Sequence, residues 1–492
     1  MIFLDGSPLT LETMAAVAID RAPVELTDSA RHKMTASRQV INDILKKDIA
    51  VYGVNTGFGK LSDVRIAAAD LQRLQLNLVR SHACGVGDPL SIEETRAMML
   101  LRANVLAAGF SGARPVLAER LVQMLNAGIH PVIPSRGSVG ASGDLAPLAH
   151  LALVVIGEGL AEFQGERMNG FDALSAVGLK PIELEAKEGL ALLNGTQAIG
   201  AVGGLALARA FRLLDRANEA AAMSLEALRD TPAAYDPRIH AARPHQGQID
   251  VAADLLRLME GSEIRLSHLD DDPRVQDAYS IRCVPQVHGA VLGALRHVRD
   301  ILEIETGSGT DNPLVFAAEG DVISGGNFHG APLAYAFDYA AIVMTDLGGI
   351  SERRIERLVN PDLSEGLPAF LTSHAGTGSG FMMAQVTAVA LLNECKVLAH
   401  PASTDNMPTS GGKEDHVSMG MTSALKFRTI VENVARVLAI EFMAAAEGLE
   451  YRKPLKPGVG VLARYNWVRE RMPAVVEDRV LGIQIEALSQ EL

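Results

Sequence analysis

The chain has 492 residues, of which 48% are hydrophobic, and a formal net charge of −14 at pH 7. This length and composition indicate a folded protein of about two to four domains, and the acidic balance argues against nucleic acid as a partner, since nucleic-acid-binding surfaces are basic. The three scattered cysteines, Cys84, Cys283 and Cys395, indicate free thiols in a reducing compartment. Residues 1–5 lack the basic start and apolar run of a secretory signal, so we expect a cytoplasmic protein.

The first half of the sequence predicts short helices and loops. Proline and glycine cluster around residues 85–89, 109–115 and 128–143, where they interrupt any long helix. The run Ile129–Pro134 is typical of a short extended segment.

One uncharged stretch, Gly189–Ala208, has the length of a membrane span. Asn194, Thr196, Gln197 and several glycines interrupt it, so we interpret it as buried core. We therefore expect no membrane partner.

From about residue 196 onward the sequence predicts long helices. Thr196–Thr231 contains no proline, and a helix of that length would span roughly 50 Å. Gln286–Asn312 carries apolar residues at three- and four-residue steps, which is the pattern of an amphipathic helix. Similar patterns cover Leu333–Asn360, Phe381–His400 and the segment from His416 to about Tyr451.

Long helices of this kind have to bury their apolar stripes against one another, which produces a bundle. A coiled-coil rod fits less well, because the stripes are rich in alanine and glycine and show no sustained heptad. The sequence therefore predicts an all-α, mainly helical fold, with a mixed helical region over residues 1–195 and a bundle of long helices with C-terminal helices over residues 196–492.

The segment 137–150, GSVGASGDLAPLAH, is the most informative in the chain. At its centre, Gly143 has no Cβ, so its amide nitrogen can approach the Ala141 carbonyl carbon at little steric cost. Ring closure with loss of water, followed by dehydration of Ser142, would produce 4-methylideneimidazole-5-one (MIO), an electrophile that no ordinary side chain supplies. The tripeptide alone is usually a simple turn. The glycine spacing fits neither common phosphate-binding loop, and Ser142 does not lie in a G-x-S-x-G elbow.

This segment resembles the active-site signature of the aromatic amino acid ammonia-lyases, a family that includes the histidine, phenylalanine and tyrosine lyases and related aminomutases. The resemblance covers almost the whole chain and continues, in the same order as in the family, in Tyr52–Gly59, Glu188–Gln197, Gln276–Arg282, Gly325–His329 and Glu414–Met419. It implies a fold of the aspartase/fumarase-like superfamily, an MIO group formed from Ala141, Ser142 and Gly143 without metal or nucleotide, and a homotetramer whose active sites draw on several subunits.

The resemblance also implies a catalytic base. Tyr52 would take the β-proton of an amino acid substrate, although a free tyrosine has a pKa near 10 and needs help from neighbouring groups near neutral pH. The glycines that follow it, Gly53, Gly57 and Gly59, fit a loop that closes over the substrate.

Further roles follow from the same resemblance. Arg282 would bind the substrate carboxylate through its planar guanidinium group. Tyr279, which precedes it by one helical turn if the segment is helical, would be a catalytic residue beside the electrophile. Gln276 would position the substrate. Asn194 would hydrogen-bond the ring oxygen of the electrophile, and Phe328 would wall the pocket.

Substrate choice is indicated by the Ser81-His82 pair, which resembles the histidine branch of the family; the tyrosine branch carries His-Leu and the phenylalanine branch Phe-Leu at this place. The resemblance therefore implies deamination of L-histidine to urocanate and ammonia, with His82 hydrogen-bonded to the imidazole of the substrate. Glu414, Gln197 and His329 match the same branch. Glu414 would transfer a proton or hold the imidazole or the amine of the substrate.

Two departures from the family pattern leave the substrate open. Lys413 stands where the family has an amide and could alter the pKa of Glu414, and Gly378 stands where the family has Asn. A tyrosine, phenylalanine or modified-histidine lyase, a 2,3-aminomutase, and a catalytically inactive helical scaffold remain alternatives.

Overall fold

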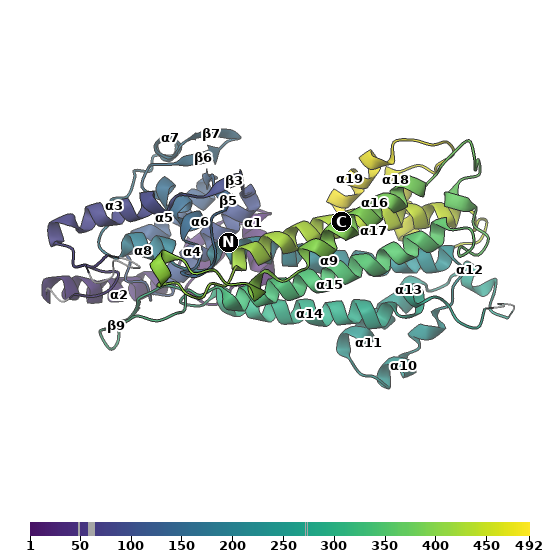
Figure 1. Ribbon diagram of the computed structural model, residues 1–492, viewed down its shortest axis with the longest axis horizontal. Coiled ribbons are helices and arrows are strands. Elements are labelled where there is room, and N and C mark those ends of the chain that lie inside the picture. Colours follow the sequence, from purple (N-terminus) through teal and green to yellow (C-terminus); the bar gives the residue numbers. More distant parts are fainter. Residues whose placement is uncertain (48–49, 58–63, 271, 273) are drawn as a thin grey trace. The chain divides into compact units, whose positions relative to one another are not determined.

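Most of the described chain is helical, as the apolar periodicity predicts, and the mainly helical fold class is confirmed (Figure 1). The computed structural model describes residues 1–47, 50–57, 64–270, 272 and 274–492. Phe58 and Gly59, at the end of the Tyr52 motif, lie outside these residues.

The long helices predicted in the second half of the sequence are all present. They are α9 (Gln197–Ala227), α14 (Val284–Thr306), α15 (Ala331–Val359), α16 (Met382–Leu398) and α17 (Gly420–Glu450). Helix α17 begins later than predicted because the residues before it bond elsewhere: the Val417 amide donates to Asn406 and the Ser418 hydroxyl donates to the Gly140 carbonyl.

Shorter helices and small sheets make up the rest. The first part of the chain forms α1 (Leu11–Ala18), α2 (Asp28–Lys47), α3 (Leu71–His82), α4 (Ile92–Ala107), α5 (Pro115–Ala127), α6 (Leu145–Val155), α7 (Gly170–Ala176) and α8 (Glu188–Leu193). The later short helices are α10 (Pro237–Ala241), α11 (Gln246–Leu258), α12 (Glu263–Leu266), α13 (Tyr279–Arg282), α18 (Val459–Arg471) and α19 (Leu481–Glu491).

The strands pair in small sheets. Strand β1 (Ile2–Leu4) pairs in parallel with β2 (Val24–Leu26), and β3 (Val86–Pro89) pairs antiparallel with β5 (Pro134–Arg136). The antiparallel order β4-β6-β7 joins β4 (His130–Pro131), β6 (Leu160–Phe163) and β7 (Glu166–Asn169), with His130 opposite Glu162. A last pair joins β8 (Leu314–Phe316) and β9 (Asp321–Ile323). Strand β4 and the start of β5 fall in the segment predicted to be extended.

Contacts between residues group the described chain into two compact units. The first comprises Met1–Ala208, Val298–Asp338 and Pro401–Leu425; the second comprises Arg209–His297, Tyr339–His400 and Lys426–Leu492. The boundaries of these units differ from the division into residues 1–195 and 196–492 that the sequence predicts. That division stays a prediction.

Within the second unit the long helices pack around a buried carboxylate. Glu441 of α17 accepts hydrogen bonds from Ser224 of α9 at 2.8 Å and from Ser351 of α15 at 2.6 Å. It also forms an ion pair with the equally buried Arg354 of α15 at 2.5 Å. A charge without water is tolerated only when it is paired and hydrogen-bonded, so this cluster specifies how the three helices meet.

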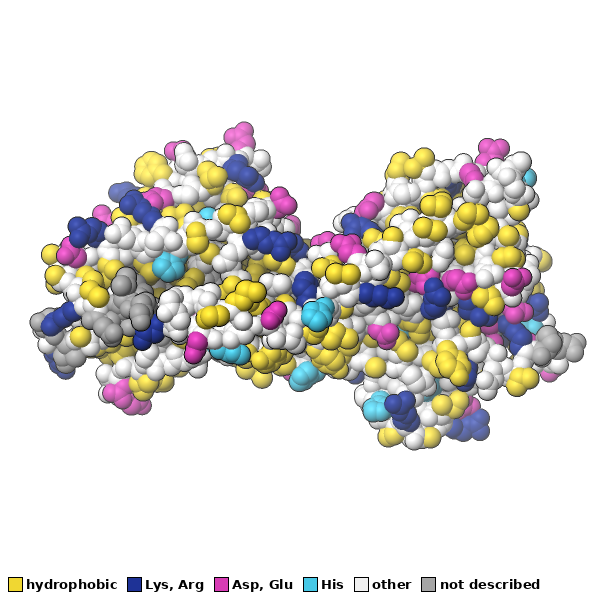
Figure 2. Space-filling view, viewed as in Figure 1, with side chains coloured by type: hydrophobic (Ala, Val, Ile, Leu, Met, Phe, Trp, Pro, Cys, Tyr) yellow, Lys and Arg dark blue, Asp and Glu magenta, His cyan; other side chains and the backbone are white. Residues whose placement is uncertain are grey.

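Three helical segments are long and apolar enough to cross a membrane by length and composition alone: Gln197–Ala227, Ala331–Val359 and Met382–Thr404. In the first, 72% of the most apolar stretch is buried, whereas in the third only 22% is. Helix α16, within the third segment, leaves Met383, Val386 and Val397 exposed. Figure 2 shows hydrophobic side chains lying among charged ones on the face in view. The surface of α16 is thus unusually apolar for a helix of a soluble monomer.

Candidate active site

The Ala141-Ser142-Gly143 loop lies in the first unit, just before α6, and its backbone packs against Gly195. Gly143 has φ +73°, and a Cβ on it would lie 2.2 Å from the Gly195 carbonyl oxygen, so only glycine fits there. The Asp144 amide donates a 2.7 Å hydrogen bond to the same oxygen. The backbone of the loop is therefore held against the segment between α8 and α9.

Asp144 ties the loop down from its other end. Its two carboxylate oxygens accept hydrogen bonds from Ser138 Oγ at 2.7 Å and from the Ile199 amide at 2.8 Å, in the first turn of α9. Burial raises the pKa of Asp144 to about 6 against the opposing effect of these hydrogen bonds. A carboxylate at a helix N-terminus is favourable, so this contact joins the loop to α9.

Asn194 faces the loop from the end of α8. Its Nδ2 atom donates a 2.7 Å hydrogen bond to the Ser142 carbonyl oxygen. Arg102 of α4, fully buried, donates to the Asn194 carbonyl oxygen from both terminal nitrogens, at 2.8 and 2.9 Å. Burial lowers the pKa of Arg102 to about 10. The buried guanidinium thus fixes the backbone that presents the Asn194 amide.

Glu414 contacts the reactive serine itself. Ser142 Oγ donates to Glu414 Oε1 at 2.5 Å, and Thr409 Oγ1 donates to Glu414 Oε2 at 2.5 Å. The Thr409 amide also donates to the Glu414 carbonyl oxygen at 2.8 Å. Sequence reasoning missed Thr409, because no motif spacing points to it; only the pairing of these two residues across a tight turn gives it a role.

His82 is the last residue of α3 and is half-buried. Its Nδ1 lies 2.9 Å from the Leu78 carbonyl oxygen and donates to it in the tautomer that leaves Nε2 as an acceptor. Burial lowers the pKa of His82 below its usual value, against the raising effects of the Leu78 hydrogen bond and the Glu414 charge. Near neutral pH the ring is therefore neutral.

These residues line one cavity of about 680 Å³, a size typical of small-molecule sites. Of the residues singled out from the sequence, the cavity brings together Tyr52, His82, Ser142, Asn194, Phe328 and Glu414. It also contains residues that the sequence did not indicate: Asn77, Asn312 and Ser410, and the apolar Val64, Ile66, Leu74, Leu78, Leu145 and Leu190. The lining is mostly apolar, and its polar side chains include Asn194 and Glu414, both hydrogen-bonded to Ser142.

Tyr52 reaches this cavity through a tight turn. Gly53 has φ +72°, and a Cβ on it would lie 2.9 Å from side-chain atoms of both Leu190 and Pro313. The Val51 amide donates to Asn55 Oδ1 at 2.8 Å within the same turn. The glycine after Tyr52 is thus needed for close packing, while Gly57 lines the cavity.

Gln276, Tyr279 and Arg282 belong to the second unit and are not among the cavity-lining residues. Tyr279 and Arg282 lie one turn apart on α13, as the sequence predicts, with the guanidinium carbon 4.3 Å from the centre of the Tyr279 ring. Tyr279 is 71% exposed. Arg282 is half-buried, and its Nε has no hydrogen-bond partner. Tyr279 and Arg282 are therefore displayed together on α13, and Gln276 is exposed three residues before Tyr279.

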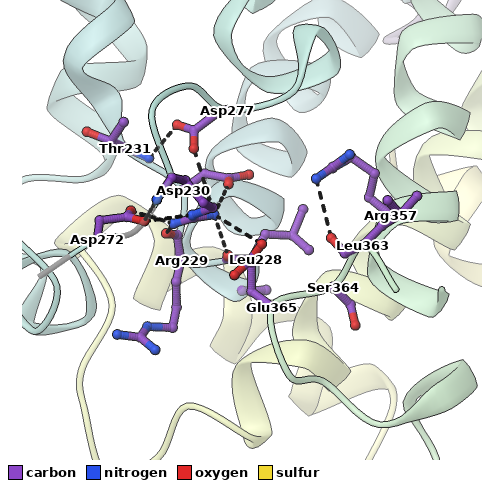
Figure 3. A network of polar contacts seen from close by, with 12 residues as sticks. Leu228, Arg229, Asp230, Thr231, Asp272, Asp277, Arg357, Leu363, Ser364 and Glu365 are labelled. Atoms are coloured by element: carbon purple, nitrogen blue, oxygen red, sulfur yellow. Dashed lines mark hydrogen bonds and ion pairs between the residues drawn. The ribbon is translucent and has the colours of Figure 1, made fainter. Parts of the chain in front are cut away.

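A network of ion pairs holds the segment that carries Gln276 and Tyr279 (Figure 3). Arg274 pairs with Asp230 at 2.6 Å and with Asp272 at 2.7 Å, and Asp277 Oδ2 accepts a 2.7 Å hydrogen bond from the Thr231 amide. Burial, with the charge of Asp277, raises the pKa of Asp230 to about 8. The network ties this segment to the end of α9.

Four other residues considered from the sequence do not line the cavity: Gln197, His329, Lys413 and Gly378. The His329 ring stacks on His416 with centres 5.7 Å apart, and the buried Gln197 donates to Thr310 at 2.8 Å. Lys413 is exposed, and Gly378 lies in the second unit. Neither residue is among those that line this cavity. Among the described residues, no group of three or more His, Cys, Asp or Glu side chains is placed to hold a metal ion.

Known proteins match both the sequence and the fold. Residues 9–470 match the family model of the aromatic amino acid lyases. A histidine ammonia-lyase of Koribacter versatilis (strain Ellin345) is 56% identical over 99% of this chain and 96% of that protein.

Solved structures agree with this relationship. The crystal structure of histidine ammonia-lyase from Trypanosoma cruzi superposes with a TM-score of 0.92 at 45% identity, covering 100% of this chain and 92% of that one. Tyrosine aminomutase from Streptomyces globisporus superposes with a TM-score of 0.94 at 39% identity, covering 99% and 96%. The chain belongs to the aromatic amino acid lyase family.

Proposed function

We propose that this chain is an L-histidine ammonia-lyase, which converts L-histidine to trans-urocanate and ammonia without oxidation. The observation that carries the proposal is a single cavity in which His82, with a neutral ring, lies among the same lining residues as Ser142, Asn194 and Glu414. The histidine ammonia-lyase of Koribacter versatilis, 56% identical over nearly the full length, supports the same substrate. The acidic charge and the free cysteines support a cytoplasmic location.

The cofactor of this proposal is the MIO group formed from Ala141, Ser142 and Gly143. The residues around the loop fit it: the Ser142 carbonyl, which becomes the ring oxygen, already accepts a hydrogen bond from Asn194, and Gly143 packs where no Cβ fits. Once formed, the group supplies an electrophilic carbon that turns the substrate amine into a better leaving group.

The chain's own residues then have separate tasks. Tyr52 takes the proton from the β-carbon, which must be positioned within hydrogen-bond reach of its hydroxyl. Asn194 stabilises negative charge at the oxygen of residue 142, and its amide needs no reorganisation because Arg102 holds the backbone behind it. The apolar walls, including Phe328 and Leu190, exclude water and strengthen these interactions.

His82 and Glu414 select the substrate. The Nε2 atom of His82 accepts a hydrogen bond from the imidazole N–H of histidine, whereas a phenyl ring offers it no donor. Glu414 lines the same cavity, and its carboxylate binds the amine or the imidazole.

The carboxylate-binding group of the active site comes from another subunit in this proposal. Gln276, Tyr279 and Arg282 are absent from the cavity lining of the first unit, and we propose that a homotetramer brings them to it. The exposed apolar face of α16 supports self-association, because apolar side chains such as Met383 and Val397 gain stability when a second copy covers them.

A second candidate function uses the same electrophile but acts on another substrate or gives another product. The likeness to the tyrosine aminomutase of Streptomyces globisporus, at 39% identity, favours a 2,3-aminomutase or a tyrosine lyase. A lyase for phenylalanine or a modified histidine would use the same chemistry. Lyase and mutase share the same electrophile, so the products distinguish them.

One assay separates these functions. The purified protein is mixed with L-histidine, L-tyrosine or L-phenylalanine, and absorbance is followed in the bands of urocanate, coumarate and cinnamate while ammonia is measured. We expect urocanate and ammonia in equal amounts from histidine. A β-amino acid product without ammonia would establish the mutase, and no product from any of the three would contradict the proposed function.

A further inference from the structure

We infer that Glu414 also acts before any substrate arrives: its carboxyl group is the acid that removes the Ser142 hydroxyl while the electrophile forms. This inference rests on the proposed MIO group and assigns one residue to one step of its formation.

The contact that carries the inference is the one between the carboxyl group and the serine. Glu414 Oε1 and Ser142 Oγ lie 2.5 Å apart, at the short end of the range for a hydrogen bond between a hydroxyl and a carboxylate. The two residues are 272 positions apart in the sequence, so the contact exists only in the folded first unit.

Glu414 is fixed in the orientation that this task requires. Thr409 Oγ1 donates to the other carboxylate oxygen at 2.5 Å, and the backbones of the two residues pair as an isolated antiparallel bridge. With Oε2 bonded to Thr409, Oε1 remains directed at Ser142. In the observed contact the Ser142 hydroxyl is the donor; when Glu414 is protonated, the same pair of oxygens holds the hydrogen bond in the reverse direction, with the acid at the leaving oxygen, which is the geometry that general acid catalysis needs.

The other polar groups of the loop have different partners. Both carboxylate oxygens of Asp144 accept hydrogen bonds, from Ser138 and from the Ile199 amide. The Asn194 amide donates to the Ser142 carbonyl and not to its hydroxyl. Among these neighbours Glu414 is thus the acid placed at the Ser142 hydroxyl.

Formation of the electrophile releases two waters in succession. Ring closure joins the Gly143 nitrogen to the Ala141 carbonyl carbon, and the carbonyl oxygen leaves as the first water with the protons of the Gly143 and Ser142 nitrogens. The Cα proton of Ser142 then passes to water while the Cβ–Oγ bond breaks. Glu414 donates its proton to the departing oxygen, which leaves as the second water, and the carboxylate regains a proton from solvent. The Cα=Cβ double bond that remains is the methylidene group, and no oxidant or reductant is consumed.

The test measures the intact mass of the folded protein, not its turnover. Wild type should be lighter than its sequence by two waters, about 36 Da. Glu414→Gln should lose only the first water and remain about 18 Da heavier than fully matured chain after correction for the substitution. General acid catalysis contributes about 10²- to 10⁴-fold, so the second dehydration should be slowed by at least about 100-fold in a time course after synthesis.

Matched variants separate chemistry from folding. Asp415→Asn removes the same charge at the next residue and should mature fully, since the Asp415 side chain is exposed. Thr409→Val leaves the acid in place but frees its orientation, and should mature slowly. Formate or acetate added to folded Glu414→Ala, in which the truncated side chain leaves room for a small acid, should release the second water, which a purely structural role would not allow.

The outcomes are distinct. Full loss of both waters in Glu414→Gln at the wild-type rate would overturn the inference. Retention of both waters would also overturn it, because Glu414 would then act in ring closure. An unmodified mass in active wild type would instead overturn the proposed electrophile itself.

Discussion

The side-chain nitrogen of Asn194 lies 2.7 Å from the carbonyl oxygen of Ser142 and donates a hydrogen bond to it. Arg102, whose guanidinium is buried in α4, donates two hydrogen bonds to the Asn194 carbonyl and so holds the donor from behind. Asn194 thus donates a hydrogen bond to an atom that gains negative charge in the proposed reaction, and Arg102 fixes the backbone of this donor.

Replacing Asn194 by Ala should therefore reduce kcat far more than it changes KM. Loss of one preorganised donor to a developing oxyanion costs about 10²- to 10³-fold in kcat, or about 2.7–4 kcal/mol. Steady-state kinetics with L-histidine measure this, with the intact mass as a control that the electrophile still forms. An unchanged kcat in fully matured variant would remove Asn194 from the mechanism.

The intact mass of wild type should be about 36 Da below the mass of its sequence, because two waters leave when the 141–143 loop cyclises. Ser142→Ala should fold normally. It cannot form the methylidene group, so its activity should fall by several orders of magnitude. Mass spectrometry and circular dichroism check both points. Active protein with an unmodified mass would refute the proposed cofactor.

Replacing His82 by Leu should weaken turnover of histidine mainly through substrate binding. The loss of one polar contact to the imidazole corresponds to about 1–3 kcal/mol, and the apolar replacement should favour tyrosine or phenylalanine relative to histidine. Kinetics on all three amino acids measure this, with His82→Gln as the control that keeps a polar group. If histidine turnover is unaffected in His82→Leu, the residue has only a structural role.

Assembly should be a homotetramer by light scattering, and activity should depend on it. A charge on the exposed face of α16, as in Val397→Arg, should dissociate the assembly and abolish turnover, because Arg282 would no longer reach a neighbouring cavity. Val476→Arg, which changes a comparably exposed valine outside α16, is the control and should remain assembled. A fully active monomer would contradict the proposal.

Stability should depend on pH through Glu226. Burial raises the pKa of Glu226 to about 7, although the Gly458 amide donates to its carboxylate. A carboxyl group whose pKa is higher in the folded than in the unfolded state contributes stability that is complete below its usual pKa and is lost as the pH rises through the folded value. We therefore expect the melting temperature to fall between about pH 5 and pH 8, with a loss on the order of 2–3 kcal/mol.

The variant Glu226→Gln keeps an acceptor for the Gly458 amide and removes the ionisation. Its melting temperature should vary less with pH than that of wild type, as thermal denaturation in matched buffers can measure. Parallel pH profiles for the two proteins would show that Glu226 is ionised in the folded state at no cost.

Properties encoded by nearby residues could be predicted from the sequence. The apolar periodicity of Gln286–Asn312 reflects the 3.6-residue turn of a helix, and α14 covers most of that range. The pairing of Tyr279 with Arg282 likewise follows from one helical turn. The formation of an electrophile could be inferred from segment 137–150 because ring closure involves three consecutive residues.

Properties that depend on distant segments were decided only by the tertiary structure. Thr409 was not predicted, because its bond to Glu414 has no signature in spacing, and the contact of Glu414 with Ser142 joins residues 272 positions apart. Burial, which raises the pKa of Glu226 and lowers that of His82, is likewise a property of the packed chain and not of either residue. Helical periodicity and loop chemistry act over a few residues, whereas desolvation and side-chain contacts arise only when the chain excludes water around them.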